Sequence, residues 1–278
     1  MTANLDYIMF VYGLGLALLA ILLFGLSSGV PSPLPWRRLA VSSLLLGACS
    51  WVDMAAVEFH EQTVLEVART VLLLAAGAFL VDFARVCWAA VGGRLLGRWI
   101  LLPLFALGLL GALAGWHGVD AAASYALGLT GGLWSAAALW RFQRSGAPHA
   151  RALRFPAISM VVFVMLEFLV TRKASFPPAL WLNEESFAAA LHVRSQIICI
   201  AVALPFLAGL WIYYRALLGD AHPRLVDRAG RASQALMLAA LAVIVAAGFF
   251  VTAGVGKSAD RDQRRTIYEH AAASAACS

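Results

Sequence analysis

The chain has 278 residues, of which 62% are hydrophobic and 13% are charged, and its formal net charge is +6 at pH 7. Soluble domains typically contain about 25% charged residues, and a chain of this length cannot enclose so much apolar surface in water. The composition therefore excludes an ordinary soluble domain and favours a protein whose surroundings are lipid.

Apolar runs of about 20 residues, the length that a helix needs to cross a bilayer, recur from one end of the chain to the other. In chain order they cover residues 7–29, 39–57, 64–89, 99–116, 121–139, 155–170, 191–217 and 232–255. The first run has no basic residue before it and is longer than the apolar core of a cleavable signal peptide, so it should stay in the membrane. We predict an all-α, polytopic transmembrane helical bundle of about eight spans.

Basic residues are divided unevenly between alternate loops. Thirteen of the 21 fall on one side, in and beside the loops at 37–38, 85–98, 141–154 and 215–231. The positive-inside rule assigns that side to the cytoplasm, so both termini are predicted to be extracytoplasmic, in agreement with an even number of spans. Because the positive charge follows the loops in this way, it indicates topology, and no nucleic-acid partner is expected.

The longer extracytoplasmic loop, 171–190, contains proline and tryptophan, and we expect it to form an ordered cap at the membrane interface. After the last run, Ile267, Ala271 and Ala275 recur at helical spacing. We therefore divide the chain into a transmembrane module, 1–256, and the start of an extracytoplasmic helix, 257–278, that would belong to a truncated following domain. The four cysteines are isolated and indicate neither a disulfide framework nor a zinc site.

Ionisable residues gather near the predicted extracytoplasmic ends of the spans. Each such group costs about 2.5–3.5 kcal/mol at the centre of a membrane, so each requires a physical reason. One interpretation is an outward-opening pocket, in which Arg69 and Arg194 could hold an anionic ligand, or Asp53 and Glu167 a cationic one. The candidate ligand-binding residues are Trp51, Asp53, Glu58, Glu66, Arg69, Glu167, His192 and Arg194.

A structural interpretation of the same residues stays open. They could reach toward lipid headgroups or form ion pairs between helices, and the spacing of Glu66 and Arg69 allows a pair on one helix face. Asp82 and Arg85 repeat this spacing at the inner end of the same predicted helix, where we expect a purely structural pair.

Catalytic motifs are missing from the sequence. It contains no phosphate-binding glycine loop, no nucleophile elbow and no convincing metal-ligand spacing. We therefore expect no catalytic residues, no cofactor and no metal, and this chain is not expected to be an enzyme. A secondary transporter or small-solute permease is the alternative function, although the charges crowd one face instead of lining a path across the membrane.

Three short segments resemble the multi-pass N-terminal membrane module of bacterial sensor histidine kinases and diguanylate cyclases. They are DYIMFVYG at 6–13, LGACSWVDM at 46–54, and FPPALWLN at 176–183, the last followed by Ser186-Phe187 and a span that starts near Arg194. Trp51 and Asp53 match the group. Cys49 and Ser50 stand where that group commonly has His or Gly followed by Glu, so no role of that acid carries over.

The resemblance implies a function as well as a fold. It implies a sensory and anchoring module in the bacterial inner (cytoplasmic) membrane that recognises a small or lipid-derived ligand from outside. A helix rearrangement would then pass to a downstream histidine kinase or diguanylate cyclase domain, in a protein that is expected to be a homodimer.

Overall fold

A computed structural model describes residues 3–29, 32–58, 62–191, 193 and 195–221. Their regular structure is helical apart from one isolated bridge between Thr171 and Asn183, which confirms the all-α prediction for this part of the chain. The longer helices are α1 (Ala3–Gly29), α2 (Trp36–Glu58), α3 (Gln62–Ala90), α4 (Leu101–Leu110), α5 (Trp116–Ala123), α6 (Thr130–Gln143), α7 (Arg154–Val164), α8 (Glu184–Leu191) and α9 (Ser195–Ala221). Short 3₁₀ turns are η1 (Arg98–Ile100), η2 (Gly111–Ala114) and η4 (Ala150–Leu153), and π-helical turns are η3 (Ser124–Leu129) and η5 (Met165–Leu169).

The protein is a multi-pass helical membrane protein. Within the described residues, five helices are long and apolar enough to cross a bilayer: Ile8–Ser28, Trp36–Ala56, Thr63–Ala90, Ala150–Leu169 and Ser195–Asp220. The predicted span 99–116 forms a shorter apolar helix, Arg98–Ala114, and the predicted span 121–139 lies in the helical stretch α5–η3–α6. The predicted span 232–255 and the predicted helix 257–278 lie outside the described residues, so eight spans and the orientation of the termini stay predictions.

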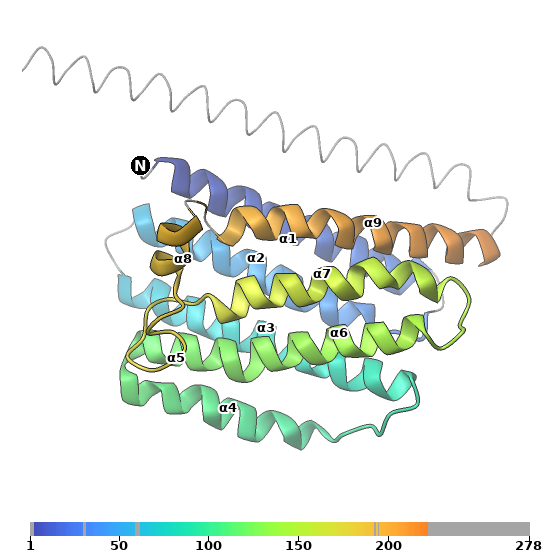
Figure 1. The fold of residues 1–278 in the computed structure, drawn as a ribbon, viewed down its shortest axis with the longest axis horizontal. Coiled ribbons are helices and arrows are strands. Elements are labelled where there is room, and N and C mark those ends of the chain that lie inside the picture. The colour runs from blue at the N-terminus through green and yellow to red at the C-terminus, as the bar shows by residue number, and fades with distance from the viewer. Residues whose placement is uncertain (1–2, 30–31, 59–61, 192, 194, 222–278) are drawn as a thin grey trace, which may run out of the picture.

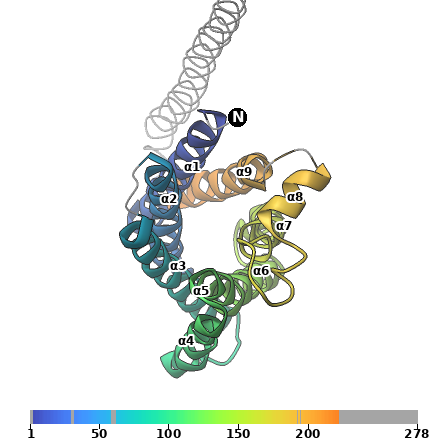
Figure 2. The ribbon, with the colours of Figure 1, turned by 90° about the vertical axis from the view of Figure 1, so that its left-hand side faces the viewer.

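Six helices form a closed ring, which Figure 2 shows nearly end-on. Contacts run from α1 to α2, α3, α6, α7 and α9 in turn, and α9 returns to α1. Helices α4 and α5 pack against each other beside α3 and η3, and α4 lies at the edge of the bundle (Figure 1). The ring therefore encloses an interior that residues distant in sequence line together.

Close helix crossings hold the wall of this ring. A Cβ atom on Gly13 of α1 would lie 2.4 Å from the indole nitrogen of Trp51 and 2.9 Å from the carbonyl oxygen of Gly47 on α2. A Cβ atom on Gly131 of α6 would lie 2.9 Å from the backbone nitrogen of Val81 on α3. Larger residues at either glycine would force the backbones apart, because ordinary Cβ contacts are longer than these.

The two ends of the ring differ. At one end the fully buried Trp36 lies between Phe83 and Tyr213, with ring centroids 6.0 Å apart in both pairs. These aromatic side chains come from α2, α3 and α9, and they fill this end of the ring interior. The opposite end carries the polar residues described below.

A folded cap follows η5 at the polar end. The backbone nitrogen and the side-chain oxygen of Asn183 exchange hydrogen bonds of 3.0 Å with Ser186, which caps the start of α8. The Asn183 amide also donates to the carbonyl of Ala179, and the Glu184 backbone nitrogen donates to that of Thr171. The expectation of an ordered loop at 171–190 is confirmed.

Helix α9 closes the ring and contains a proline in its interior, Pro205. Proline has no backbone N–H, so the carbonyl of Ala201, four residues earlier, loses its helical hydrogen bond. The neighbouring Leu204 and Phe206 both line the ring interior.

Candidate functional site

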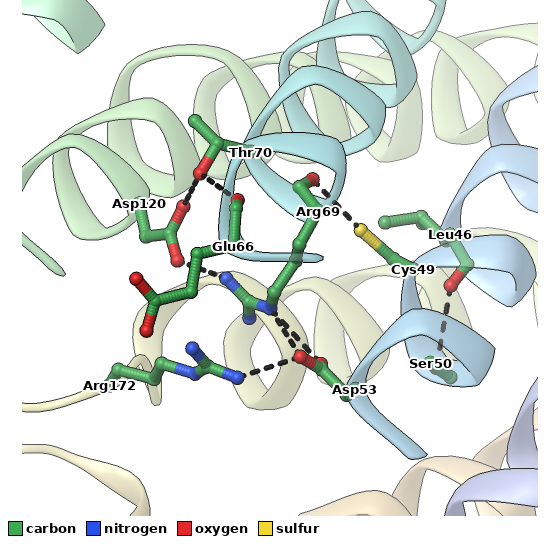
Figure 3. A network of polar contacts seen from close by, with 9 residues as sticks. All are labelled: Leu46, Cys49, Ser50, Asp53, Glu66, Arg69, Thr70, Asp120 and Arg172. Carbon is green, nitrogen blue, oxygen red and sulfur yellow. Dashed lines mark hydrogen bonds and ion pairs between the residues drawn. The ribbon is translucent and has the colours of Figure 1, made fainter. Parts of the chain in front are cut away.

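A network of charges joins three helices at the polar end of the ring (Figure 3). The Nε atom of Arg69 on α3 lies 2.8 Å from Oδ1 of Asp53 on α2. Its Nη1 atom forms a second ion pair with Oδ2 of Asp120 on α5. The hydroxyl of Thr70 lies 2.6 Å from the other oxygen of Asp120. Arg69 therefore bridges two carboxylates that come from helices on either side of it.

The cap adds a second cation to this network. Nη2 of Arg172, two residues after Val170, donates to Oδ1 of Asp53 at 2.7 Å. Arg172 follows Thr171, whose backbone carbonyl accepts the hydrogen bond from Glu184 at the start of α8. The position of Arg172 is thus tied to the fold of the cap, and Asp53 connects the cap to the helical ring.

Burial makes these contacts important for stability. The side chains of Arg69, Asp53 and Asp120 are only 14%, 16% and 5% exposed. A buried ion pair repays its desolvation only when the remaining hydrogen-bonding groups are also satisfied, and removal of one partner commonly costs about 3–5 kcal/mol. Because each carboxylate here has at least two partners, the network holds α2, α3 and α5 in one arrangement.

A second polar contact crosses the interior of the ring. The hydroxyl of Tyr12 on α1 donates to Oε2 of Glu167 on η5 at 2.6 Å. Within the described residues, the other oxygen of Glu167 accepts no hydrogen bond. Tyr12 is buried, whereas Glu167 keeps part of its surface open.

The two groups of polar residues line one cavity. The space in it that the centres of water molecules can occupy is about 50 Å³, which holds about four waters at 10–15 Å³ each. The cap closes part of it through Thr171 and Arg172. Asp53, Arg69, Asp120, Glu167 and Arg172 all line it, together with the hydroxyl-bearing residues Tyr12, Ser50 and Ser124.

Two π-helical turns shape this end of the ring. η3 provides Ser124 and η5 provides Glu167 to the cavity, and the two turns contact each other. A π turn widens a helix by one residue and is frequent at functional sites. Glu167 faces the interior from such a turn, next to the cap.

The structure brings together three of the eight candidate residues, because Asp53, Arg69 and Glu167 line the cavity. Trp51 lies against α1 instead, where its indole nitrogen is 3.4 Å from the carbonyl of Phe10. Glu66 lies beside the network (Figure 3), and Arg69 pairs with Asp53 and Asp120 rather than with it. The side chain of Glu58, together with His192 and Arg194, is outside the part of the chain that the structure describes.

Sequence reasoning missed three residues that carry the site. Asp120 lies one residue before the predicted span 121–139 and so falls outside it. Tyr12 lies in the segment at 6–13 that carries the resemblance, but it has no charge that would mark it as a partner of Glu167. Arg172 lies in the predicted loop 171–190, and nothing in the sequence shows that it reaches Asp53.

The cavity offers charged and hydroxyl side chains to a ligand. Its described residues include no cluster of three or more His, Cys, Asp or Glu side chains that could hold a metal ion. Neither a family model, nor a curated protein, nor a solved structure matches the chain. The chemistry of the cavity itself is therefore the best guide to function.

Proposed function

We propose that the protein is a membrane-embedded sensory module that binds a small or lipid-derived ligand in the polar cavity and relays a change in helix packing to a downstream output domain. The observation that carries this proposal is the convergence of Asp53, Arg69, Asp120 and Arg172 on one cavity. The ligand acts without chemical conversion, and this chain serves as a receptor and membrane anchor.

The ion pairs provide a physical basis for a relay. A ligand that forms hydrogen bonds with the cavity residues changes the balance among pairs that connect α2, α3, α5 and the cap. It shifts the protein between two packings only through a difference in affinity for them. The buried network supplies such a difference, because each pair is strong only while its geometry is kept.

The two ends of the ring support one-sided access. The cavity lies at the end away from most of the arginines. The positive-inside rule assigns the arginine-rich end to the cytoplasm, and so the cavity end to the extracytoplasmic side. At the arginine-rich end, Trp36, Phe83 and Tyr213 fill the interior. In this proposal the ligand enters from outside the bacterial inner membrane. The output domain, a kinase or cyclase that acts as a homodimer, lies in the cytoplasm and is connected through a further span, because the C-terminus of the transmembrane module is predicted to be extracytoplasmic.

Spin labels at the end remote from the cavity test the relay. The labels are attached to cysteines at Ser27 on α1 and Arg215 on α9, both exposed, after the native cysteines are replaced. Asp53→Asn is expected to shift the distribution of distances between the labels, measured in nanodiscs. Glu66→Gln, a neighbouring acid outside the cavity lining, should leave it unchanged.

A distribution for Asp53→Asn that superimposes on that of the parent would refute the relay. Should this variant fail to fold, Arg172→Gln perturbs the same carboxylate from a side chain that is 29% exposed and serves in its place. The coding sequence beyond Ser278 is a separate test, since a stop codon there contradicts an output domain in the same chain.

A small-solute permease is the second candidate, because a second cavity in the interior of the ring adjoins the polar cavity. Tyr12 and Leu46 line both the polar cavity and an apolar one below it. Vesicles containing the protein are compared with empty vesicles for swelling in glycerol or urea. Faster swelling that Asp53→Asn abolishes would establish the permease, whereas equal rates favour the sensor.

A further inference from the structure

An apolar cavity occupies the middle of the helical ring, directly next to the polar cavity. Its lining comes from α1, α2, α3, α7, η5 and α9, and water-sized spheres have about 110 Å³ for their centres. The lining is almost entirely hydrocarbon, apart from three serines, of which Ser42 donates its hydroxyl to the carbonyl of Ala76. A water molecule gains little there, because such a site offers too few polar partners.

The polar and the apolar cavity adjoin each other. They share Tyr12 and Leu46, and the hydroxyl of Tyr12 points to Glu167 at the boundary between them. Leu19, Met160 and Leu207 mark the deep end, and Tyr12, Phe168 and Ile200 mark the end next to the polar cavity.

We propose that the ligand is a single-chain amphiphile, with its polar head between Tyr12, Glu167 and the charge network and its hydrocarbon tail in the apolar cavity. This inference rests on the proposed function and names the chemical class of the ligand. The apolar cavity extends over eight residues of α9, from Ile200 to Leu207, and the rise from the first to the last is about 10 Å at 1.5 Å per residue. Allowing about 1.3 Å per carbon for an extended chain, the part of the tail inside this cavity contains roughly eight carbons, so a ten-carbon chain reaches from the head to its deep end.

The head is a hydrogen-bond donor without negative charge. Both arginines of the described lining are already paired with Asp53, so an anionic head would have to displace a carboxylate. One oxygen of Glu167 is free to accept a hydrogen bond from a ligand hydroxyl or ammonium. The hydroxyl of Ser124, which is buried and has no hydrogen-bond partner among the described residues, lines the same cavity.

Gly15 allows a direct test of the tail cavity. It lines the apolar cavity, and a Cβ atom there would meet no heavy atom within 4 Å. The Cβ atom of Gly15→Phe therefore has room, and its ring is expected to occupy the cavity. Gly25 lies on the same helix, is equally open, and is not part of the cavity lining, so Gly25→Phe is a matched control.

The experiment uses the full chain in lipid nanodiscs and a decanol that carries a photoreactive diazirine close to its methyl end. Labelled peptides are mapped by mass spectrometry. Labelling is expected at the deep residue Met160, which is 5% exposed, above the background at Leu113, which is 90% exposed to lipid. Gly15→Phe should lower labelling at Met160 about tenfold, as expected when a few buried methylene contacts are lost, and Gly25→Phe should not.

Competition by unlabelled amphiphiles identifies the chemistry of the ligand's polar head. An excess of decanol or decylamine should suppress the labelling of Met160, whereas decanoate should not, and Glu167→Gln should remove that preference. Labelling that is indifferent to Gly15→Phe overturns the tail assignment, and equal competition by decanoate overturns the head assignment. If the spin labels report a relay while Met160 is not labelled, only the amphiphile is refuted. If Met160 is labelled and the label distances never change, the sensing proposal fails instead.

Discussion

Two charge clusters lie at opposite ends of the helical bundle. Both consist of ion pairs between aspartate and arginine, but their roles differ. At the arginine-rich end, Asp82 on α3 pairs with Arg38 at 3.0 Å and with Arg85 at 2.6 Å. Arg98, which is 75% exposed, lies 4.0 Å away. At the polar end, Asp53 and Asp120 share Arg69, and all three line a cavity.

The difference lies in what surrounds each carboxylate. Asp82 is one acid among several arginines and lines neither of the two cavities, so its cluster fastens the ends of α2 and α3. The Arg69 cluster has two buried acids, links three helices and a cap, and faces enclosed space. A cluster of charges alone therefore does not indicate a binding site. A cluster of charges that lines a cavity does indicate one.

The largest expected effect is a difference in stability between two variants, each of which removes one arginine from one cluster. Arg69→Met leaves Asp120 with only Thr70 and should lower the free energy of unfolding by about 3–5 kcal/mol. Arg85→Met should lower it by about 1–2 kcal/mol, because Asp82 keeps Arg38. Denaturant unfolding of both variants, followed by tryptophan fluorescence, measures the difference. Equal losses would mean that the clusters are equivalent.

The next largest effect tests whether Asp53 and Arg172 act as a pair. Asp53→Asn should cost about 2–3 kcal/mol, since hydrogen bonds to charged groups contribute up to about that much. Arg172→Gln should cost less, because its side chain is 29% exposed. The double variant should lose about 1 kcal/mol less than the sum of the two. A loss in the double variant equal to the sum of the two single losses would show that the cap does not stabilise the network.

A smaller loss is expected at the arginine-rich end when Asp82 is neutralised. Asp82→Asn should lower the free energy of unfolding by about 1–2 kcal/mol, because Arg38 and Arg98 stay in contact with water and the buried Arg85 keeps its hydrogen bond to the carbonyl of Leu96. Photolabelling of Met160 should not change, since Asp82 is remote from both cavities. Altered labelling in this variant would contradict the separation of the two ends.

The smallest effect concerns the hydrogen bond across the interior. Tyr12→Phe should cost about 1 kcal/mol, because water in the polar cavity can replace the lost partner of Glu167. Tyr214→Phe, at the arginine-rich end and without a side-chain hydrogen bond among the described residues, should have no measurable effect. The unfolding midpoints of the two variants provide the comparison, and equal midpoints would refute a role for the Tyr12 hydroxyl.

The helices themselves could be predicted because lipid imposes one rule on every span. Runs such as 64–89 and 191–217 are long and mostly apolar, so their length and hydropathy identify them despite a few charged residues. The run at 121–139 shows the weakness of this rule. Its glycines and small residues dilute the hydropathy, and the helix takes its place in the ring through contact with α3 and α7.

The polar partners could be predicted only in part. The depth of Asp53 and Glu167 indicated their importance, but their partners depend on which helices become neighbours. The spacing of Glu66 and Arg69 favours a pair in an isolated helix, yet two buried carboxylates from other helices attract Arg69 more strongly in a low dielectric. The π turns that aim Ser124 and Glu167 inward leave no periodic signal in the sequence.

Pro205 makes one level of helix α9 less rigid than the rest of the ring. The carbonyl left without a partner at Ala201 makes α9 easier to bend at that level than a continuous helix of the same length. Leu204 and Phe206, which flank the proline, border the hydrocarbon interior, and Leu204 is also 56% exposed on the lipid side. A change in the contents of the apolar cavity should therefore act first on the curvature of α9 at this proline.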